Sequence, residues 1–327
     1  MQDDRPPRRW GRRLLVSLIV VISLLVAGEF LARFHLGLGD PPLWVEHPTI
    51  EYLAVPSRTY HRYGNRISYN AFSMRSDEFP VRREDTDEFR VICFGDSVIN
   101  GGSKVDQTSL ATERIKRRLG KTLQCPVMVG NVSAGSWGPA NQLAYAEAYG
   151  LFEADVVVLV VSSNDYKDHP TFAPAVGIRP GLPAGPPFLA MQELFTRFGP
   201  TYARRARREG RREAKPVDPV AVEQSLVAAA SLIALAQRLP ARVVVLQHAS
   251  LWEVRTGKMQ PGHAVLLQTF RDMGIDPIQS VEKLRASLRH GRSPYLDHIH
   301  PNETGHEILG DLLIAGILDA GRPETSD

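Results

Sequence analysis

The stretch FRVICFGDSVINGG, residues 89–102, decides how this chain folds. An apolar run of strand length ends at Gly95, and a polar, glycine-rich turn follows before helical spacing begins near Ser109. This pattern places Ser97 at the carboxyl end of a buried strand, which is where open α/β sheets bind ligands. A serine in that position can be a nucleophile or a helix-capping residue, and Gly-Asp-Ser alone leaves both interpretations open.

Strand-like and helix-like segments alternate along the rest of the chain. Further apolar, β-branched strand candidates are residues 125–130, 154–161 and 242–247. Helical spacing lies between or after them, at residues 108–119, 142–149, 220–239 and 308–318. The alternation predicts an α/β fold in which helices cover a parallel sheet.

The first 34 residues indicate a membrane segment. Arginines are concentrated in residues 1–13, and the apolar run 14–34 is long enough to span a bilayer. Because arginines stay on the cytoplasmic side, we expect a cytoplasmic tail, one transmembrane anchor and an extracytoplasmic remainder, in a bacterial periplasm or at the cell surface. The alternative is a signal peptide cleaved near Ala27, but the apolar pattern continues beyond Glu29 without a clear cleavage site.

Composition limits the other classes of function. A hydrophobic fraction of 43% over 327 residues suffices for one large core, and a net charge of +3 gives no case for a nucleic-acid partner. Cys93 and Cys125 are the two cysteines, so there is no disulfide framework and no metal-binding spacing of cysteines. Two buried thiols are the favoured interpretation, with a single bridge between neighbouring strands as the alternative. No pattern specifies an oligomeric state.

Two segments flank or interrupt the predicted domain, which covers residues 89–320. Residues 35–88 show no sustained period and are expected to form an extended lead-in, in which residues 70–75 could border the site but are more simply interpreted as packing. Residues 168–216 form a proline-rich and then basic insertion that leaves the sheet at its carboxyl edge. It is either a lid over an anionic polymer or phospholipid surface or, as the composition favours, a solvated charge run. Residues 321–327 are a tail.

A histidine-rich segment, SPYLDHIHPNETGH, precedes the last helix at residues 293–306. Asp297 and His300 are three residues apart, so in a turn the carboxylate can hold one imidazole N–H and fix its tautomer. Alternatively, His298, His300 and His306 could bind a metal, because His-x-His supplies two nitrogen ligands. No cysteine or second acidic cluster completes such a site.

Four blocks in chain order resemble the SGNH hydrolases, also called the GDSL family. They are residues 94–97, 131–138, 163–165 and 297–301, and the resemblance covers about residues 88–320. It implies a flavodoxin-like three-layer α/β/α sandwich, and a serine esterase or acyltransferase that needs no metal or cofactor. Ester-linked acyl groups are the implied substrates, with O-acetyl groups on envelope or exported carbohydrate first and lipid esters second. The alternative on the same fold is a non-catalytic polysaccharide-binding protein.

The resemblance also implies roles for individual residues. Ser97 would be the nucleophile, His300 the general base and Asp297 the carboxylate that orients it. The oxyanion hole would consist of the backbone N–H groups of Ser97 and Gly138 and the side-chain amide of Asn164. Two departures affect this hole: Ser162 stands where the family's third block usually begins with glycine, and Gly135 is an alternative to Gly138. Asp96 is expected to brace the turn.

Overall fold

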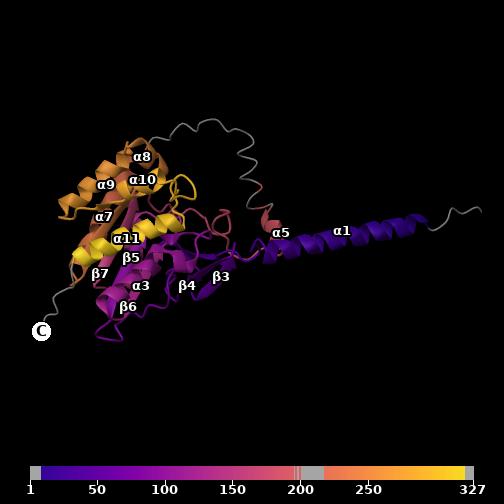
Figure 1. The fold of residues 1–327 in the computed structure, drawn as a ribbon, viewed down its shortest axis with the longest axis horizontal. Helices are drawn as coiled ribbons and strands as arrows, with labels where there is room; N and C mark the ends of the chain where they lie inside the picture. Colours follow the sequence, from indigo (N-terminus) through magenta and orange to yellow (C-terminus); the bar gives the residue numbers. More distant parts are fainter. Residues whose placement is uncertain (1–8, 195, 197–198, 200–216, 321–327) are drawn as a thin grey trace, which may run out of the picture.

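The computed structural model describes residues 9–194, 196, 199 and 217–320. Helix α1 (Arg9–Phe34) extends away from an α/β domain that contains the remaining elements (Figure 1). The basic run at 200–216 lies outside the described residues, so its interpretation as a lid stays a prediction.

A five-stranded parallel sheet forms the centre of the domain. Its order is β6-β5-β7-β8-β9, which in chain order is 2-1-3-4-5, the flavodoxin-like order. The strands are β5 (Phe89–Gly95), β6 (Val127–Ser133), β7 (Val156–Ser162), β8 (Arg242–His248) and β9 (Ile278–Gln279). The chain order reverses between β5 and β7, so the strand that precedes Ser97 borders the point where such sheets bind ligands.

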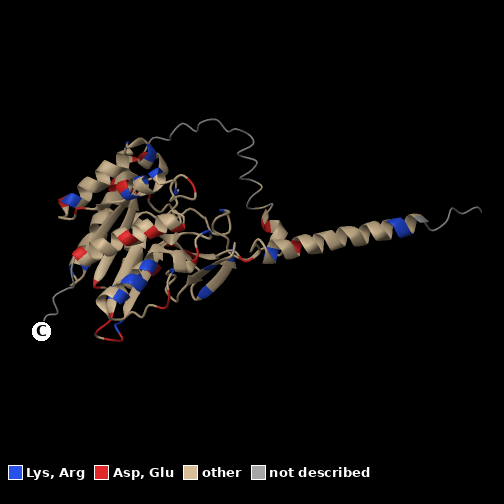
Figure 2. Ribbon diagram, viewed as in Figure 1, with Lys and Arg blue, Asp and Glu red and all other residues tan. Residues whose placement is uncertain are grey.

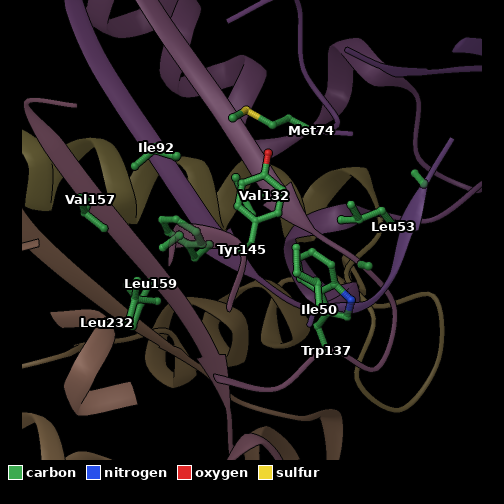
Figure 3. Close-up of a cluster of buried hydrophobic side chains, with 14 of the residues drawn as sticks. Ile50, Leu53, Met74, Ile92, Val132, Trp137, Tyr145, Val157, Leu159 and Leu232 are labelled. Atoms are coloured by element: carbon green, nitrogen blue, oxygen red, sulfur yellow. The ribbon is translucent and has the colours of Figure 1, made fainter. Parts of the chain in front are cut away.

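Helices cover both faces of this sheet. Because side chains alternate along a strand, Val91 and Cys93 of β5 enter one core while Ile92 and Phe94 enter the other. Figure 3 shows Ile92, Val157 and Leu159 in the second core, with Tyr145 and Leu232. The first core contains α3 (Ala111–Leu123) and α11 (Glu303–Asp319), and the second contains α4 (Pro139–Tyr149), α7 (Pro219–Gln237) and α9 (Pro261–Asp272). The predicted three-layer sandwich is confirmed.

The lead-in is more ordered than the sequence predicts. Instead of an extended segment it contains two antiparallel hairpins. Their strands are β1 (Trp44–His47), β2 (Glu51–Ala54), β3 (Arg58–Arg62) and β4 (Asn65–Tyr69). These strands are four or five residues long, and in β3 only Tyr60 and Arg62 are buried, so the sequence shows no sustained period.

Short elements complete the domain, and several follow the carboxyl ends of strands. They are α2 (Ser97–Asn100), η1 (Gln107–Ser109), η2 (Asp165–Lys167), α5 (Ala190–Glu193), α8 (Leu251–Thr256) and α10 (Val281–Arg289). Helix α5 lies in the proline-rich insertion, where the sequence predicts no regular structure. Cys93 and Cys125 are free thiols, so the alternative of a bridge between them is wrong.

Helix α1 is long and apolar enough to cross a membrane. The most apolar 18-residue window within residues 10–34 has a mean hydropathy of 2.7, and none of that window is buried against the domain. Figure 2 shows that charged residues lie only near its two ends. Helix α7 passes the same test of length and composition, but its Ala229, Leu232 and Ile233 pack in the sheet's second core.

Candidate active site

The turn after β5 places Ser97 at the start of α2. Gly95 is needed there because an added Cβ would lie 2.7 Å from Ile99 Cγ2 and 3.1 Å from the Val160 carbonyl oxygen. Asp96 caps α2, and its Oδ1 accepts a hydrogen bond of 2.8 Å from the Val98 N–H. Asp96 and Val98 are buried whereas Ser97 is half-buried, so the turn presents the serine hydroxyl at the sheet's edge.

Three side chains form a hydrogen-bonded chain at this edge. His300 Nε2 lies 2.9 Å from Ser97 Oγ, and His300 Nδ1 lies 2.7 Å from Asp297 Oδ2. An ionised Asp297 makes Nδ1 the protonated nitrogen, which leaves Nε2 to accept the serine O–H. The structure therefore brings together, from positions 203 residues apart, a hydroxyl and an imidazole oriented to take its proton.

Asp297 is held as an anion by the loop that it belongs to. Its Oδ1 accepts the backbone N–H groups of Ile299 at 3.0 Å and His300 at 2.9 Å. Partial burial alone would raise its pKa, but these two N–H donors and the His300 ring outweigh it and lower the pKa to about 2. Because the backbone fixes the carboxylate, the carboxylate in turn fixes the imidazole.

Asp96, although next to Ser97, has the structural position that the sequence predicts. Burial raises its pKa to about 6, and the hydrogen bond from Val98 and the charge of His300 only partly oppose this. Asp96 contacts α2 through its capping hydrogen bond, whereas the His300 imidazole is hydrogen-bonded to Asp297.

Asn164 follows β7 by two residues and reaches the same edge of the sheet. Its side-chain amide has no hydrogen-bond partner among the described residues, although its loop is firmly held. Ser163 Oγ donates to the buried carboxylate of Glu253 at 2.6 Å, and Asp165 accepts the Ser162 N–H at 2.8 Å. A fixed loop with an unpaired amide is suited to hold an oxygen atom of a ligand.

The two glycines of the β6–α4 loop differ in what their N–H groups do. Gly138 donates its N–H to Asn141 Oδ1 at 3.0 Å, in the turn that begins α4. An added Cβ on Gly138 would lie 1.9 Å from the Asp168 carbonyl oxygen, so this residue also permits a close approach of two loops. The Gly135 N–H has no partner within the described part of the chain. Of the two glycines, Gly135, the alternative left open by the sequence, is thus the one whose N–H is not engaged by a described residue.

Arg75 is a functional candidate that sequence reasoning assigned to packing. Its guanidinium is fully buried and donates to the carbonyl oxygens of Asn100, Gly102 and Val105, the last at 2.7 Å. It therefore binds the loop that immediately follows Ser97 and α2. No described carboxylate pairs with Arg75, and burial lowers its pKa to about 10. The signal in the sequence was an arginine in a segment without periodicity, but the sequence alone could not show which carbonyl groups it binds.

The alternative of a metal site is not supported. His298 is exposed, His300 contacts Ser97 and Asp297, and buried His306 has its Nδ1 3.3 Å from the Ala111 nitrogen. The three rings therefore do not converge on one point. Among the residues that the structure describes, no group of three or more His, Cys, Asp or Glu could hold a metal ion.

No protein-family model matches the chain, and a search of curated proteins finds no match. Solved structures do resemble it. A member of the lipolytic G-D-S-L family from Veillonella parvula is 14% identical with a TM-score of 0.43, over 69% of this chain and 97% of that one. The lipase/acylhydrolase from Enterococcus faecalis is 15% identical with a TM-score of 0.44, over 73% and 100%.

An acetyl xylan esterase is also 15% identical with a TM-score of 0.44, over 70% of this chain and 100% of its own. The structural neighbours are thus lipolytic G-D-S-L proteins and acetyl esterases, the class that the sequence motifs resemble. Identities and TM-scores this low do not transfer an activity to this chain, whose site must be argued from its own geometry.

Proposed function

We propose that this chain is a serine ester hydrolase of the SGNH type, with Ser97 as nucleophile, His300 as general base and Asp297 as its orienting carboxylate. The observation that carries the proposal is the continuous contact from Ser97 Oγ to His300 Nε2 at 2.9 Å and from His300 Nδ1 to Asp297 at 2.7 Å. This arrangement activates a hydroxyl that is otherwise a weak nucleophile.

The reaction follows from these contacts. Ser97 Oγ attacks the ester carbonyl while its proton moves to His300 Nε2, and a tetrahedral oxyanion forms. As the C–O bond to the alcohol breaks, His300 returns the proton to the leaving oxygen and an acyl-enzyme remains. Water, or a second hydroxyl such as that of a sugar, then attacks the acyl group with His300 again as base, and Ser97 is regenerated.

We propose three donors for the oxyanion. The Ser97 N–H lies in the first turn of α2, where helices leave N–H groups unpaired, and the Asn164 amide is unpaired as well. We assign the third donor to Gly135, because the Gly138 N–H is already engaged by Asn141. Such a hole favours developing negative charge over the neutral ground state.

We further propose that α1 is a retained, single-pass membrane anchor with the catalytic domain outside the cytoplasm. The large apolar side chains of α1 are half exposed or more, which would be unfavourable in water, whereas a bilayer buries them. The proposed substrates are O-acetyl groups on envelope or exported carbohydrate, as the sequence resemblance implies, with lipid esters second.

The test is ester cleavage by the full-length chain in detergent, with p-nitrophenyl acetate and a fluorophosphonate probe. The expected result is chelator-insensitive nitrophenol release and labelling of Ser97, both lost in Ser97→Ala. Ser103→Ala is the matched control, because the Ser103 hydroxyl makes no hydrogen bond with described residues. Absence of labelling in the intact chain would instead favour a non-catalytic polysaccharide-binding protein. Addition of an acetylatable polysaccharide separates hydrolysis from acyl transfer.

A further inference from the structure

The C-terminal end of α1 is hydrogen-bonded to α5 and the residues just before it. The carboxylate of Glu29 accepts the backbone N–H groups of Ala190 at 2.8 Å and Met191 at 3.0 Å. Arg33 donates to Glu29 at 2.6 Å and to the Phe188 carbonyl oxygen at 3.2 Å. These bonds hold residues 188–191 alongside the last two turns of α1.

The opposite side of α5 is fixed to the catalytic domain. Glu193 forms a buried ion pair with Arg62 of β3, and it accepts the Gly39 N–H at 2.9 Å. Ala190 packs with Ala32 and Leu38, all three of them buried. Helix α5 is thus bonded to α1 on one side and to the domain on the other, and we call it the wedge. Because of these bonds, α1 is held in position relative to the domain.

Large apolar side chains are exposed next to this wedge. Phe188 is 88% exposed, Leu189 46% and Leu36 45%, and we call these three residues the exit patch. The patch lies level with the last turn of α1, because the Phe188 carbonyl is bonded to Arg33. Aromatic and aliphatic side chains beside an arginine at the end of an apolar helix are typical of a membrane–water interface.

The candidate active site lies on the side of the sheet that faces the wedge and α1. The β3–β4 hairpin, which lies between the sheet and α1 in Figure 1, contacts the loop after α2. Asn65 Nδ2 donates to the Ser103 carbonyl at 3.1 Å, and the Arg66 N–H donates to Asp106 at 2.7 Å. At this same end of the hairpin, where Arg62 pairs with Asn65, Arg62 holds Glu193 of the wedge.

We propose that the exit patch lies in the headgroup layer of the membrane that α1 spans, and that the wedge thereby turns the carboxyl edge of the sheet toward that bilayer. The inference rests on the proposed anchor and extends it. The bilayer is the occupant of the patch because the patch is continuous with the membrane-spanning surface of α1. Esters presented at the membrane surface would then be within reach of Ser97.

The test compares depths of fluorescent labels on the full-length chain in vesicles containing headgroup- or chain-labelled nitroxide lipids. Labels are placed in a Cys125→Ser background, since Cys93 is fully buried. Leu189→Cys reports on the patch. Val81→Cys is the matched control, because Val81 is 48% exposed, similar to Leu189, and lies beside Pro80, which Arg90 binds near the start of β5. Leu25→Cys reports on α1 itself.

We expect headgroup nitroxides to quench the label at 189 several-fold more than the label at 81, and chain nitroxides to quench the label at 25. Equal quenching at 189 and 81, with the label at 25 quenched, would overturn the proposal while leaving the anchor intact. An unquenched label at 25 would overturn both, whereas esterase activity is measured independently of either.

A second variant tests the wedge. Glu29→Ala removes the acceptor for the Ala190 and Met191 N–H groups, so quenching at 189 is expected to fall toward that at 81, with the label at 25 unaffected. Unchanged quenching at 189 would show that the wedge does not hold the exit patch in the headgroup layer.

Discussion

Replacement of Arg75 by methionine tests how the serine turn is held in place. Arg75 binds the carbonyl of Asn100, the last residue of α2, and the carbonyls of Gly102 and Val105 in the loop beyond it. Methionine fills most of the same volume but donates no hydrogen bond. The variant therefore leaves carbonyl oxygens buried without donors and removes what fixes the end of α2.

Two effects of different size are expected. Each buried acceptor left without a donor is unfavourable by about 1–3 kcal/mol. Removal of a buried charge that has no carboxylate partner offsets part of the summed loss over the three carbonyls. We therefore expect the free energy of unfolding to fall by about 2–4 kcal/mol in total. A shift of the catalytic hydroxyl by about 1 Å reduces turnover on the order of 100-fold. We therefore expect kcat to fall by about that factor and KM to change far less.

The assay combines p-nitrophenyl acetate kinetics with urea unfolding of each variant. Arg90→Met is the matched control, because Arg90 is equally buried but lies near the start of β5, where it binds the Pro80 carbonyl. It should lose stability without a specific loss in kcat, and Arg75→Lys should recover part of the lost turnover. If Arg75→Met unfolds at lower urea yet keeps kcat within about twofold, Arg75 has only a structural role and the reasoning is refuted.

Further predictions concern the triad, the loop contact and acid stability. Asp297→Asn should lower kcat by about 10⁴-fold, because the amide favours the wrong imidazole tautomer; a loss below about tenfold in ester hydrolysis would contradict this. Gly138→Ala should destabilise the fold by about 1–3 kcal/mol in urea unfolding, because its Cβ meets the Asp168 carbonyl, and an unchanged midpoint would exclude that close contact. Burial lowers the pKa of His248 to about 4 and that of His306 to about 3, so between these values and about 6.5 the unfolded chain binds more protons. Urea midpoints should therefore fall as pH decreases from 7 to 5, and His306→Leu should reduce this dependence.

The fold was predictable because its strongest signals are local. Residues 89–95 and 154–161 are apolar runs that only a sheet covered on both faces can bury, and each ends in a polar turn. The hairpins of the lead-in were missed because their strands are four or five residues long and bury few positions each. Helix α5 was missed because it is stabilised by Glu29 and Arg62, which are remote from it in sequence.

The candidate site was predictable only in part, because some of its contacts are local in sequence and others join remote residues. Asp297 and His300 are three residues apart, so their contact is local, and the chain order of the blocks placed Ser97 opposite them. By contrast, the distinction between Gly135 and Gly138 depends on the single hydrogen bond to Asn141. The role of Arg75 depends on carbonyl groups 25 to 30 residues away.

The separation of Ser97 and His300 along the chain bears on when the protein can act during its biosynthesis. The two residues meet only after the segment preceding α11 has been made and α11 has packed against α3. A nascent chain made only as far as α2 already contains the serine, but it lacks the imidazole beside it. The proposed ester-cleaving chemistry is therefore withheld until the segment that carries His300 has been made and has folded against the rest of the domain.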